Sequence, residues 1–499
     1  MRSIMKKAVF LVLILSLLFC LAACDRSNDN TDSDDGSKKD KVKYTTGLEF
    51  ISKGDGTCYL SSIGSAKDIS DIVVPPVAPN GDRVIGVGGS AFAENWTVKS
   101  IVFSKGLKYI ESNAFHYCRK LENIVLPDTV EKIDMFAFVG TSLKSIDLGE
   151  GPMEIGYRAF YDLTCLEEII LSPNTISIGE GAFSRTKIKS LTIPASVSNI
   201  GMNAFEGCHN LTELFFEDGD IPLTLDGGAF YACDEITNVI LPNRIKVIDS
   251  AAFRSCNKLE SINFPEGLET IGDYAFYGCR ALKSVSLPEG IGEIGAGAFC
   301  ECVSLRDIKI PSDMIEVPSD FLKGCRSLAE IKLHDGITKI GNEAFAACTH
   351  ITELNLPDSI VEIGFGAFSA LAGVTEITIP DGVSTLSESL FYECQKLERV
   401  TLPGGIKKLP DLIFAHCDSL TSFTVPDGVE FINSRAFFSC DSLTEITLPD
   451  SLQIIGYGAF EYCDALRTVY YEGTEDQFSH VKIYENNIAI SLAEIIYLG

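Results

Sequence analysis

The feature that most constrains this chain is a short pattern that recurs along most of its length. Residues 271–290 read IGDYAFYGCRALKSVSLPEG, and residues 294–313 read IGAGAFCECVSLRDIKIPSD. Most repeats are 23 residues long, and a fixed period in this range is typical of a solenoid, in which each coil packs on its neighbours. The Phe of each Ala-Phe pair serves as a marker for its repeat. The seventeen markers, with Leu322 replacing Phe once, are Phe92, Phe115, Phe138, Phe160, Phe183, Phe205, Phe230, Phe253, Phe276, Phe299, Leu322, Phe345, Phe368, Phe391, Phe414, Phe437 and Phe460.

Each repeat is close to LPxxVxxIGxxAFxxCxxLxxIx. The LxxIxLP part alternates apolar and polar residues, which predicts a half-buried strand, and proline ends the strand because it cannot donate to a ladder. The glycine of IG predicts a tight turn with a positive φ. AFxxC predicts a short turn of irregular or 3₁₀ helix, and stacked marker rings predict a continuous apolar spine. The pattern therefore predicts a β-rich solenoid of about 17 coils.

The two ends of the chain depart from the pattern. Residues 1–23 combine the basic start MRSIMKK with the apolar run AVFLVLILSLLFC, which predicts a secretory signal peptide. Residues 24–44 are polar and charged, and we expect a disordered tether. The solenoid is predicted for residues 84–469. We expect residues 45–83 and 470–499 to cap it, because an end coil exposes apolar spine and an unpaired strand edge.

The repeats resemble the leucine-rich repeats of the BspA-like family of bacterial surface proteins. The resemblance lies in the LP, IG, AF and C positions of nearly every period from about residue 84 to 469. The stretch GLEFISKGDGTCYLSSIG at 47–64 resembles the N-terminal lead-in of that family, and YYEGTEDQFSHVKIYENN at 470–487 resembles its closing segment. The resemblance implies a leucine-rich-repeat solenoid and a surface adhesin or host-interaction protein, with proteins or glycans as partners.

The end of the signal peptide resembles a bacterial lipobox, which Leu21, Ala22, Ala23 and Cys24 match. The resemblance implies cleavage before Cys24 and lipid modification of that cysteine. Two or more acyl chains anchor a protein stably in a membrane, whereas one chain does not. An ordinary signal peptide with a chance cysteine is the alternative.

Twelve of the 17 cysteines stand three residues after the marker. Coils in a strand-paired solenoid are about 4.8 Å apart with parallel Cβ vectors, whereas a disulfide needs facing Cβ atoms about 3.8 Å apart. We therefore expect a structural ladder of buried thiols that donate to loop carbonyls; some disulfides, or a metal site, remain alternatives. The ladder residues are Cys118, Cys208, Cys233, Cys256, Cys279, Cys302, Cys325, Cys348, Cys394, Cys417, Cys440 and Cys463.

Composition and motifs argue against several classes of function. The net charge is −28, and such a surface repels nucleic acid phosphates and anionic headgroups. The six histidines fall at no common offset, and the sequence contains no HExxH, no GxSxG and no phosphate-binding glycine loop. A straight line of cysteines does not converge on a tetrahedral metal. We expect no enzyme activity, no cofactor and no metal.

The residue before the last apolar position of each strand should point outward, where a solenoid offers a face to partners. In the first half of the chain this column is largely apolar, and we expect a contact strip of Val102, Val125, Ile170, Phe215 and Ile240. In the second half, Lys309 and Lys332 could contact an anionic partner. The alternatives are that β-branched residues merely suit strands, that a flanking segment covers them, or that Asp307 and Glu330 neutralise the lysines.

One interval breaks the rhythm, because Phe205 and Phe230 are 25 residues apart. The additional residues lie in FFEDGDIPLTLDGG and should form a loop beside Phe215, where a rigid scaffold can carry recognition. The sequence as a whole predicts a lipid-anchored binding protein on the extracellular face of a bacterial membrane, with a protein or glycan partner. Envelope assembly, or substrate capture for a surface enzyme, are the alternative functions.

Overall fold

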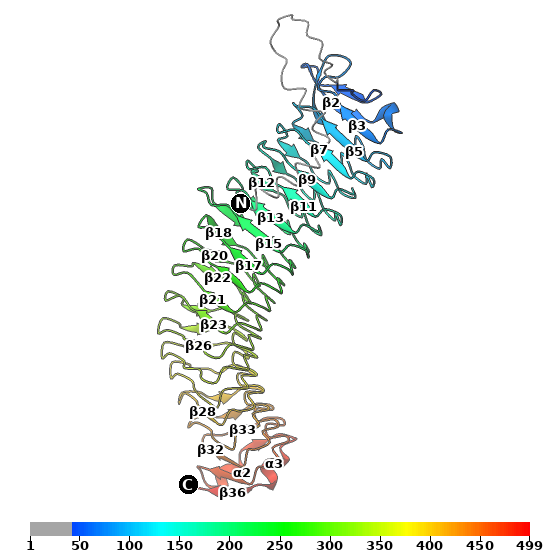
Figure 1. Cartoon of the computed structure of the whole chain (residues 1–499). Helices are drawn as coiled ribbons and strands as arrows, with labels where there is room; N and C mark the ends of the chain where they lie inside the picture. Colours follow the sequence, from blue (N-terminus) through cyan, green and yellow to red (C-terminus); the bar gives the residue numbers. More distant parts are fainter. Residues whose placement is uncertain (1–41) are drawn as a thin grey trace, which may run out of the picture.

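The structure is a computed structural model that describes residues 42–499. The predicted signal peptide, Cys24 and all but the last few residues of the predicted tether lie outside the described residues. The described chain winds into one stack of coils, which forms an elongated, curved ribbon (Figure 1). Among residues 42–499, no helix combines the length and the apolar character needed to cross a membrane. The β-solenoid predicted from the repeat is confirmed.

One row of strands comes from the xxLP part of the repeat, as predicted, and is called the LP row here. Neighbouring strands of this row are parallel and in register, so that Ile146 faces Ile169 and Leu191 faces Leu214. The strands of the LP row are β3 (Asp71–Val74), β5 (Ser100–Phe103), β7 (Asn123–Val125), β9 (Ser145–Asp147), β11 (Glu168–Ile170), β13 (Ser190–Ile193), β15 (Glu213–Phe216), β17 (Asn238–Ile240), β19 (Ser261–Asn263), β21 (Ser284–Ser286), β23 (Asp307–Lys309), β27 (Glu376–Thr378), β28 (Arg399–Thr401), β30 (Ser422–Thr424), β32 (Glu445–Leu448), β34 (Thr468–Tyr471) and β36 (Glu494–Tyr497).

A second row of short parallel strands ends at the Ile of the IG dipeptide, and the sequence analysis did not predict it. This IG row buries one branched side chain per coil, such as Ile133 or Ile271. Its strands are β4 (Arg83–Val87), β6 (Tyr109–Ile110), β8 (Lys132–Ile133), β10 (Glu154–Ile155), β12 (Ser177–Ile178), β14 (Asn199–Ile200), β16 (Leu223–Leu225), β18 (Ile245–Ile248), β20 (Thr270–Ile271), β22 (Glu293–Ile294), β24 (Glu316–Val317), β25 (Lys339–Ile340), β26 (Glu362–Ile363), β29 (Lys408–Leu409), β31 (Phe431–Ile432), β33 (Ile454–Ile455) and β35 (Lys482–Ile483).

The end segments continue both rows. At the N-terminal end, β1 (Glu49–Ser52) and β2 (Thr57–Ser62) form an antiparallel hairpin, and β2 pairs with β4. The 3₁₀ turn η1 (Gly64–Ala66) then leads into β3. At the C-terminal end, α2 (Glu475–Ser479) and α3 (Ile488–Leu492) lie before and after β35, and β36 pairs with β34. With these segments the solenoid has about 19 turns.

Where a glycine follows an IG-row strand, the neighbouring coil approaches it closely. A Cβ at Gly272 would lie 2.4 Å from the backbone N of Ser250, and a Cβ at Gly341 would lie 2.4 Å from the backbone N of Ser319. These glycines do not have a positive φ, so the sequence prediction about φ is wrong here. At these two positions a side chain would require the backbone of the preceding coil to shift.

Positive φ occurs instead in the turn around the marker, two residues before it and two residues after it. In the coil of Phe115 these residues are Asn113 (φ 60°) and Tyr117 (φ 55°). Their N–H groups point along the stack and donate to Met135 O at 3.0 Å and Val139 O at 2.7 Å in the next coil. We call this stacked turn the turn edge; its hydrogen bonds add a third ladder between coils.

The marker rings form the predicted spine, which one substitution divides. From Phe92 to Phe299 neighbouring rings stack, and the centroids of Phe138 and Phe160 are 4.9 Å apart with 7° between their planes. At Leu322 the stack stops, and Phe321 meets Phe299 edge-on at 80°. Stacking resumes at Phe345 and continues to Phe460.

Both rows of strands are also interrupted near this division. The IG-row sheet that begins at β1 ends at β22, and in the described chain the LP row has no strand between β23 and β27. The first ring pair after the break, Phe345 and Phe368, has centroids 6.3 Å apart, wider than in the first stack. The backbone hydrogen bonds of the turn edge nevertheless continue between these two coils, since Phe345 N donates to Ala367 O at 3.0 Å.

Candidate functional site

The predicted contact strip is exposed at one end only. Phe215 is 55% exposed and Ile240 is 76% exposed, whereas Val125 and Ile170 are half-buried. Val102 is 8% exposed and belongs to the buried residues. The prediction of a continuous exposed strip is therefore wrong at its N-terminal end.

Burial of Val102 follows from its neighbours in the LP row. Val73 of β3 and Val125 of β7 lie in register on either side of it. The sequence analysis assigned Val73 to a cap and did not foresee that β3 extends the LP row. The exposed apolar residues of the strip are thus Phe215 and Ile240, on the consecutive strands β15 and β17 (Figure 1).

The loop that follows β15, between the coils of Phe215 and Ile240, is held by a buried arginine. Residues 217–222, which connect β15 to β16, contain the inserted residues and the 45% exposed Ile221. Arg244 is only 5% exposed, and its guanidinium donates to Glu217 O at 3.0 Å, Val197 O at 2.6 Å and Pro194 O at 2.8 Å. One side chain thereby fixes three successive coils beside the strip.

The sequence contained a signal for this arginine. The corresponding position of other repeats is mostly Gly, Ser or Thr, as in Thr129, Gly267 and Ser359, whereas LPNRI carries Arg244. Burial lowers the pKa of Arg244, and the nearby carboxylates of Glu217 and Asp218 act in the opposite direction.

The two lysines of the predicted face already have acidic partners. Lys309 Nζ lies 2.9 Å from an oxygen of Glu289, not from Asp307, and Lys332 Nζ lies 3.4 Å from Glu330 as the alternative reading expected. Lys332 is not in a strand, because the LP row is interrupted there. Hydrogen bonds from Lys309 and Ser312 lower the pKa of Glu289 to about 2. These exposed pairs leave little unbalanced charge for an anionic partner.

The cysteine ladder has a uniform geometry. Each of the twelve cysteines is buried and forms no disulfide. The Sγ of each donates to the backbone oxygen of the marker in the preceding coil. Cys279 Sγ, for example, lies 3.2 Å from Phe253 O. Burial raises the pKa of Cys118 to about 12, so the thiol form is retained. Residues 42–499 contain no cluster of His, Cys, Asp and Glu able to hold a metal ion.

The turn edge carries a second set of exposed side chains, which the sequence analysis missed. Arginines stack there on aromatic rings: Arg158 lies 5.0 Å from the Tyr157 centroid and 5.1 Å from that of Tyr161. Further along, Arg254 lies 4.6 Å from the Tyr277 centroid. The sequence signal was the frequent occurrence of aromatic residues at the positions beside Ala-Phe. Because these positions vary from repeat to repeat, the repeat pattern does not show them.

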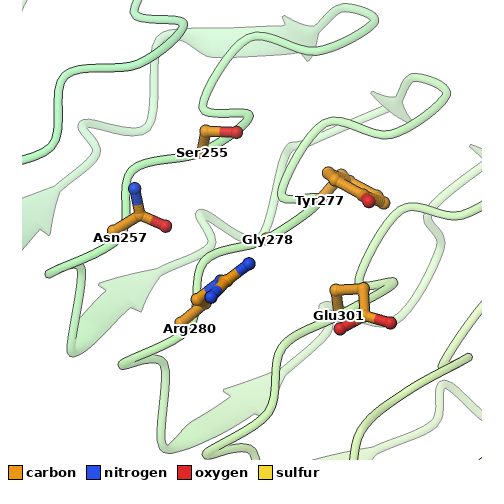
Figure 2. Close-up of a pocket in the computed structure, with 6 residues that line it drawn as sticks. All are labelled: Ser255, Asn257, Tyr277, Gly278, Arg280 and Glu301. Atoms are coloured by element: carbon orange, nitrogen blue, oxygen red, sulfur yellow. The ribbon is translucent and has the colours of Figure 1, made fainter.

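A cavity of about 610 Å³ opens on the turn edge near Tyr277. Figure 2 shows its lining from three successive coils. The lining residues are Ser255, Asn257, Tyr277, Gly278, Arg280 and Glu301.

A family profile described as "BspA type Leucine rich repeat region (6 copies)" matches residues 86–212, 224–352 and 338–467. A leucine-rich repeat protein from Bacteroides ovatus, solved as a crystal structure, is 25% identical, with a TM-score of 0.52 and coverage of 92% of this chain and all of its own.

Two further structures are less similar. A leucine rich cell surface protein from Faecalibacterium prausnitzii is 21% identical, with a TM-score of 0.39 and coverage of 89% of this chain and 99% of its own. The pneumococcal vaccine antigen PcpA is 20% identical, with a TM-score of 0.39 and coverage of 65% and 93%. No curated protein matches the sequence. Because the repeat profile covers well over half of its length, the chain belongs to the BspA-type leucine-rich repeat family.

Proposed function

We propose that this protein is a lipid-anchored binding protein of the bacterial surface, which contacts a protein partner through Phe215 and Ile240. The observation that carries the proposal is the adjacency of these two exposed apolar side chains on a rigid stack of strands. Exposed apolar groups on a preorganised scaffold favour association, because little conformational entropy is lost on binding. A scaffold of this kind acts by contact, and we assign it no catalytic step.

The inserted loop strengthens this proposal. Arg244 holds residues 217–222 against two other coils, so that Ile221 and the acidic side chains of the loop occupy fixed positions beside the strip. Apolar anchors with a polar rim are the usual composition of a protein–protein contact. We therefore expect a partner surface that combines an apolar patch with basic residues.

The binding site can be tested by pull-down of extracellular matrix proteins and mucins with the secreted part of the chain. Replacing Phe215 and Ile240 together with Ser should weaken capture about tenfold or more, because both apolar anchors are lost. The matched control replaces Ile315 and Val361 with Ser, since these residues are similarly exposed at 62% and 56% but lie elsewhere. Full binding by the Phe215/Ile240 variant would reject the strip as the site.

The anchor requires a separate experiment. The lipobox proposal assigns the lipid to Cys24. The variant Cys24→Ala removes this attachment point. We expect this variant to leave the membrane fraction and the detergent phase of a Triton X-114 extraction. Retention of Cys24→Ala in both fractions would show that the chain is held by something other than lipid on that cysteine.

A further inference from the structure

The cavity at Tyr277 lies where the turn edge carries a glycine, Gly278, between two coils that carry side chains at the same position. The position two residues after the marker holds Ser255 in one coil, Gly278 in the next and Glu301 in the third. A Cβ at Gly278 would have no atom closer than Ser255 Oγ at 3.8 Å, so the glycine opens space without being forced by its neighbours. The cavity has the ring of Tyr277 in its wall.

The ring is held in place from one side. The guanidinium carbon of Arg254 lies 4.6 Å from the Tyr277 centroid and 5.8 Å from that of Tyr274, and the two rings are 6.0 Å apart at 74°. A stacked cation fixes the ring orientation and leaves the remainder of its surface to line the cavity. An immobilised aromatic face is suited to the C–H groups of a flat, polar ligand.

The cavity is lined by one positive and one negative side chain that are not paired with each other or with other residues of the described chain. Arg280 and Glu301 both line it, and neither forms an ion pair among the described residues. A ligand carboxylate would gain from Arg280 but would meet Glu301, and a ligand ammonium group would face the reverse. Hydroxyl groups donate and accept, so an uncharged ligand with several hydroxyls satisfies both side chains together with Ser255 and Asn257.

The backbone of the turn edge is not free for a peptide. Ser255 N donates to Tyr277 O at 2.7 Å, Gly278 N to Cys300 O at 2.8 Å and Glu301 N to Lys323 O at 2.7 Å. Extended peptides gain much of their affinity from main-chain hydrogen bonds at an open strand edge, and these amides already have partners. Sugars are recognised by side chains and ring faces and do not need free amides.

We propose that this cavity binds one uncharged sugar residue of an extended glycan, with Tyr277 under the sugar ring and Arg280, Glu301, Asn257 and Ser255 on its hydroxyls. This site lies apart from Phe215 and Ile240 and does not depend on the protein contact proposed for them.

The test is affinity electrophoresis of the full-length protein in native gels cast with mannan, galactomannan, xyloglucan or dextran. At least one neutral polymer should retard the wild-type protein. Tyr277→Ala and Arg280→Ala should each raise the dissociation constant about tenfold or more. Tyr231→Ala is the matched control, because it removes a tyrosine from the same turn position in a coil outside the cavity, and its mobility should equal that of the wild type.

A variant that adds a side chain to the cavity tests the site without removing any contact of the fold. Asn tolerates a positive φ, so Gly278→Asn should fold, place a side chain in the cavity beside Tyr277 and weaken the retardation. Failure of every neutral polymer to retard the protein would overturn the proposal, as would unchanged retardation of Tyr277→Ala, Arg280→Ala and Gly278→Asn. Retardation confined to polygalacturonate or chitosan, or binding of an acidic peptide alone, would also overturn it. The Phe215/Ile240 variant should retain glycan binding, which distinguishes this result from failure of the protein-binding proposal.

Discussion

Arg244 stands out at the scale of single residues because, from a buried position, it donates to backbone carbonyls of the two preceding coils. Arg244→Met keeps the apolar stem and removes the donors to Glu217 O and Val197 O, whereas Pro194 O still accepts from Val197 N. We expect a loss of about 2–4 kcal/mol in the free energy of unfolding, measured with urea. Cleavage of residues 217–222 by a protease should accelerate at the same time.

The control for Arg244 is Arg306→Met, which changes an exposed arginine of a neighbouring part of the stack. Its unfolding free energy should stay within about 0.5 kcal/mol of the wild type. Equal stability of the two variants would mean that the guanidinium of Arg244 does not hold the coils together.

The cysteines give a second prediction at this scale. Of the fifteen cysteines in residues 42–499, Cys165 alone is exposed. Burial raises the pKa of Cys118, Cys348 and Cys394 to about 12, so these thiols lack both access and thiolate character. Titration of the folded chain from residue 25 onward with Ellman's reagent should find one fast thiol, and Cys165→Ser should remove it.

Denaturation without reductant extends that experiment. All fifteen thiols of residues 42–499 should then react, because none is paired in the structure. A clear shortfall would contradict the thiol ladder and favour disulfides between coils.

The sequence predicted the position of the ladder cysteines from spacing alone, because most coils place the third residue after the marker in the same surroundings. Spacing could not predict the burial of Val102, since this depends on which segment lies beside the first repeat. Spacing also could not reveal why the IG position holds glycine. Close approach between backbones and a positive φ both select glycine, so the sequence does not distinguish them.

At the scale of strands and turns, the break at Leu322 is the main departure from regularity. Replacing Phe321 with Ala and Leu322 with Phe restores the Ala-Phe pair of the other coils. The new ring would stack between Phe299 and Phe345, and each aromatic pair contributes about 0.5–1.5 kcal/mol beyond burial. We expect a higher melting temperature by calorimetry, together with greater hydrogen-exchange protection of residues 330–333.

The single substitution Leu322→Phe is the informative comparison for this double variant. It leaves Phe321 in the small Ala position of the turn and overpacks the spine, so it should be less stable than the double variant. A double variant that melts below the wild type would show that the break is the favoured packing.

The LP row could be predicted because its strands alternate apolar and polar residues. The IG row could not, since two residues such as Lys132 and Ile133 are too few to show a period. The turn edge was equally hidden: Tyr117 and Arg158 adopt a positive φ that their residue types disfavour, and the ladder between coils imposes it.

At the scale of the whole molecule, the hydrogen bonds of the stack run in one direction, so the last coil needs other acceptors for its N–H groups. In the turn edge the marker N–H donates to the carbonyl of the residue before the next marker, usually Ala, as Phe437 N does to Ala459 O at 2.8 Å. Phe460 has no following repeat. Its N–H donates instead to Asn487 Oδ1 at 3.0 Å, so a side chain of the closing segment replaces a backbone carbonyl.

Asn487 therefore caps the spine, and removing its amide should loosen the C-terminal end of the stack first. Its Nδ2 also donates to Gly456 O and Tyr484 O, both at 2.8 Å, and the residue is only 4% exposed. Asn487→Ala should cost about 2–3 kcal/mol in the free energy of unfolding, because buried groups lose their partners. Hydrogen exchange should accelerate at residues 456–463 before it does so near residue 200, since each coil of a solenoid is stabilised mainly by its neighbours. Asn355→Ala, an exposed asparagine, serves as control. Unchanged protection of residues 456–463 in Asn487→Ala would show that the closing segment holds the last coil by packing alone.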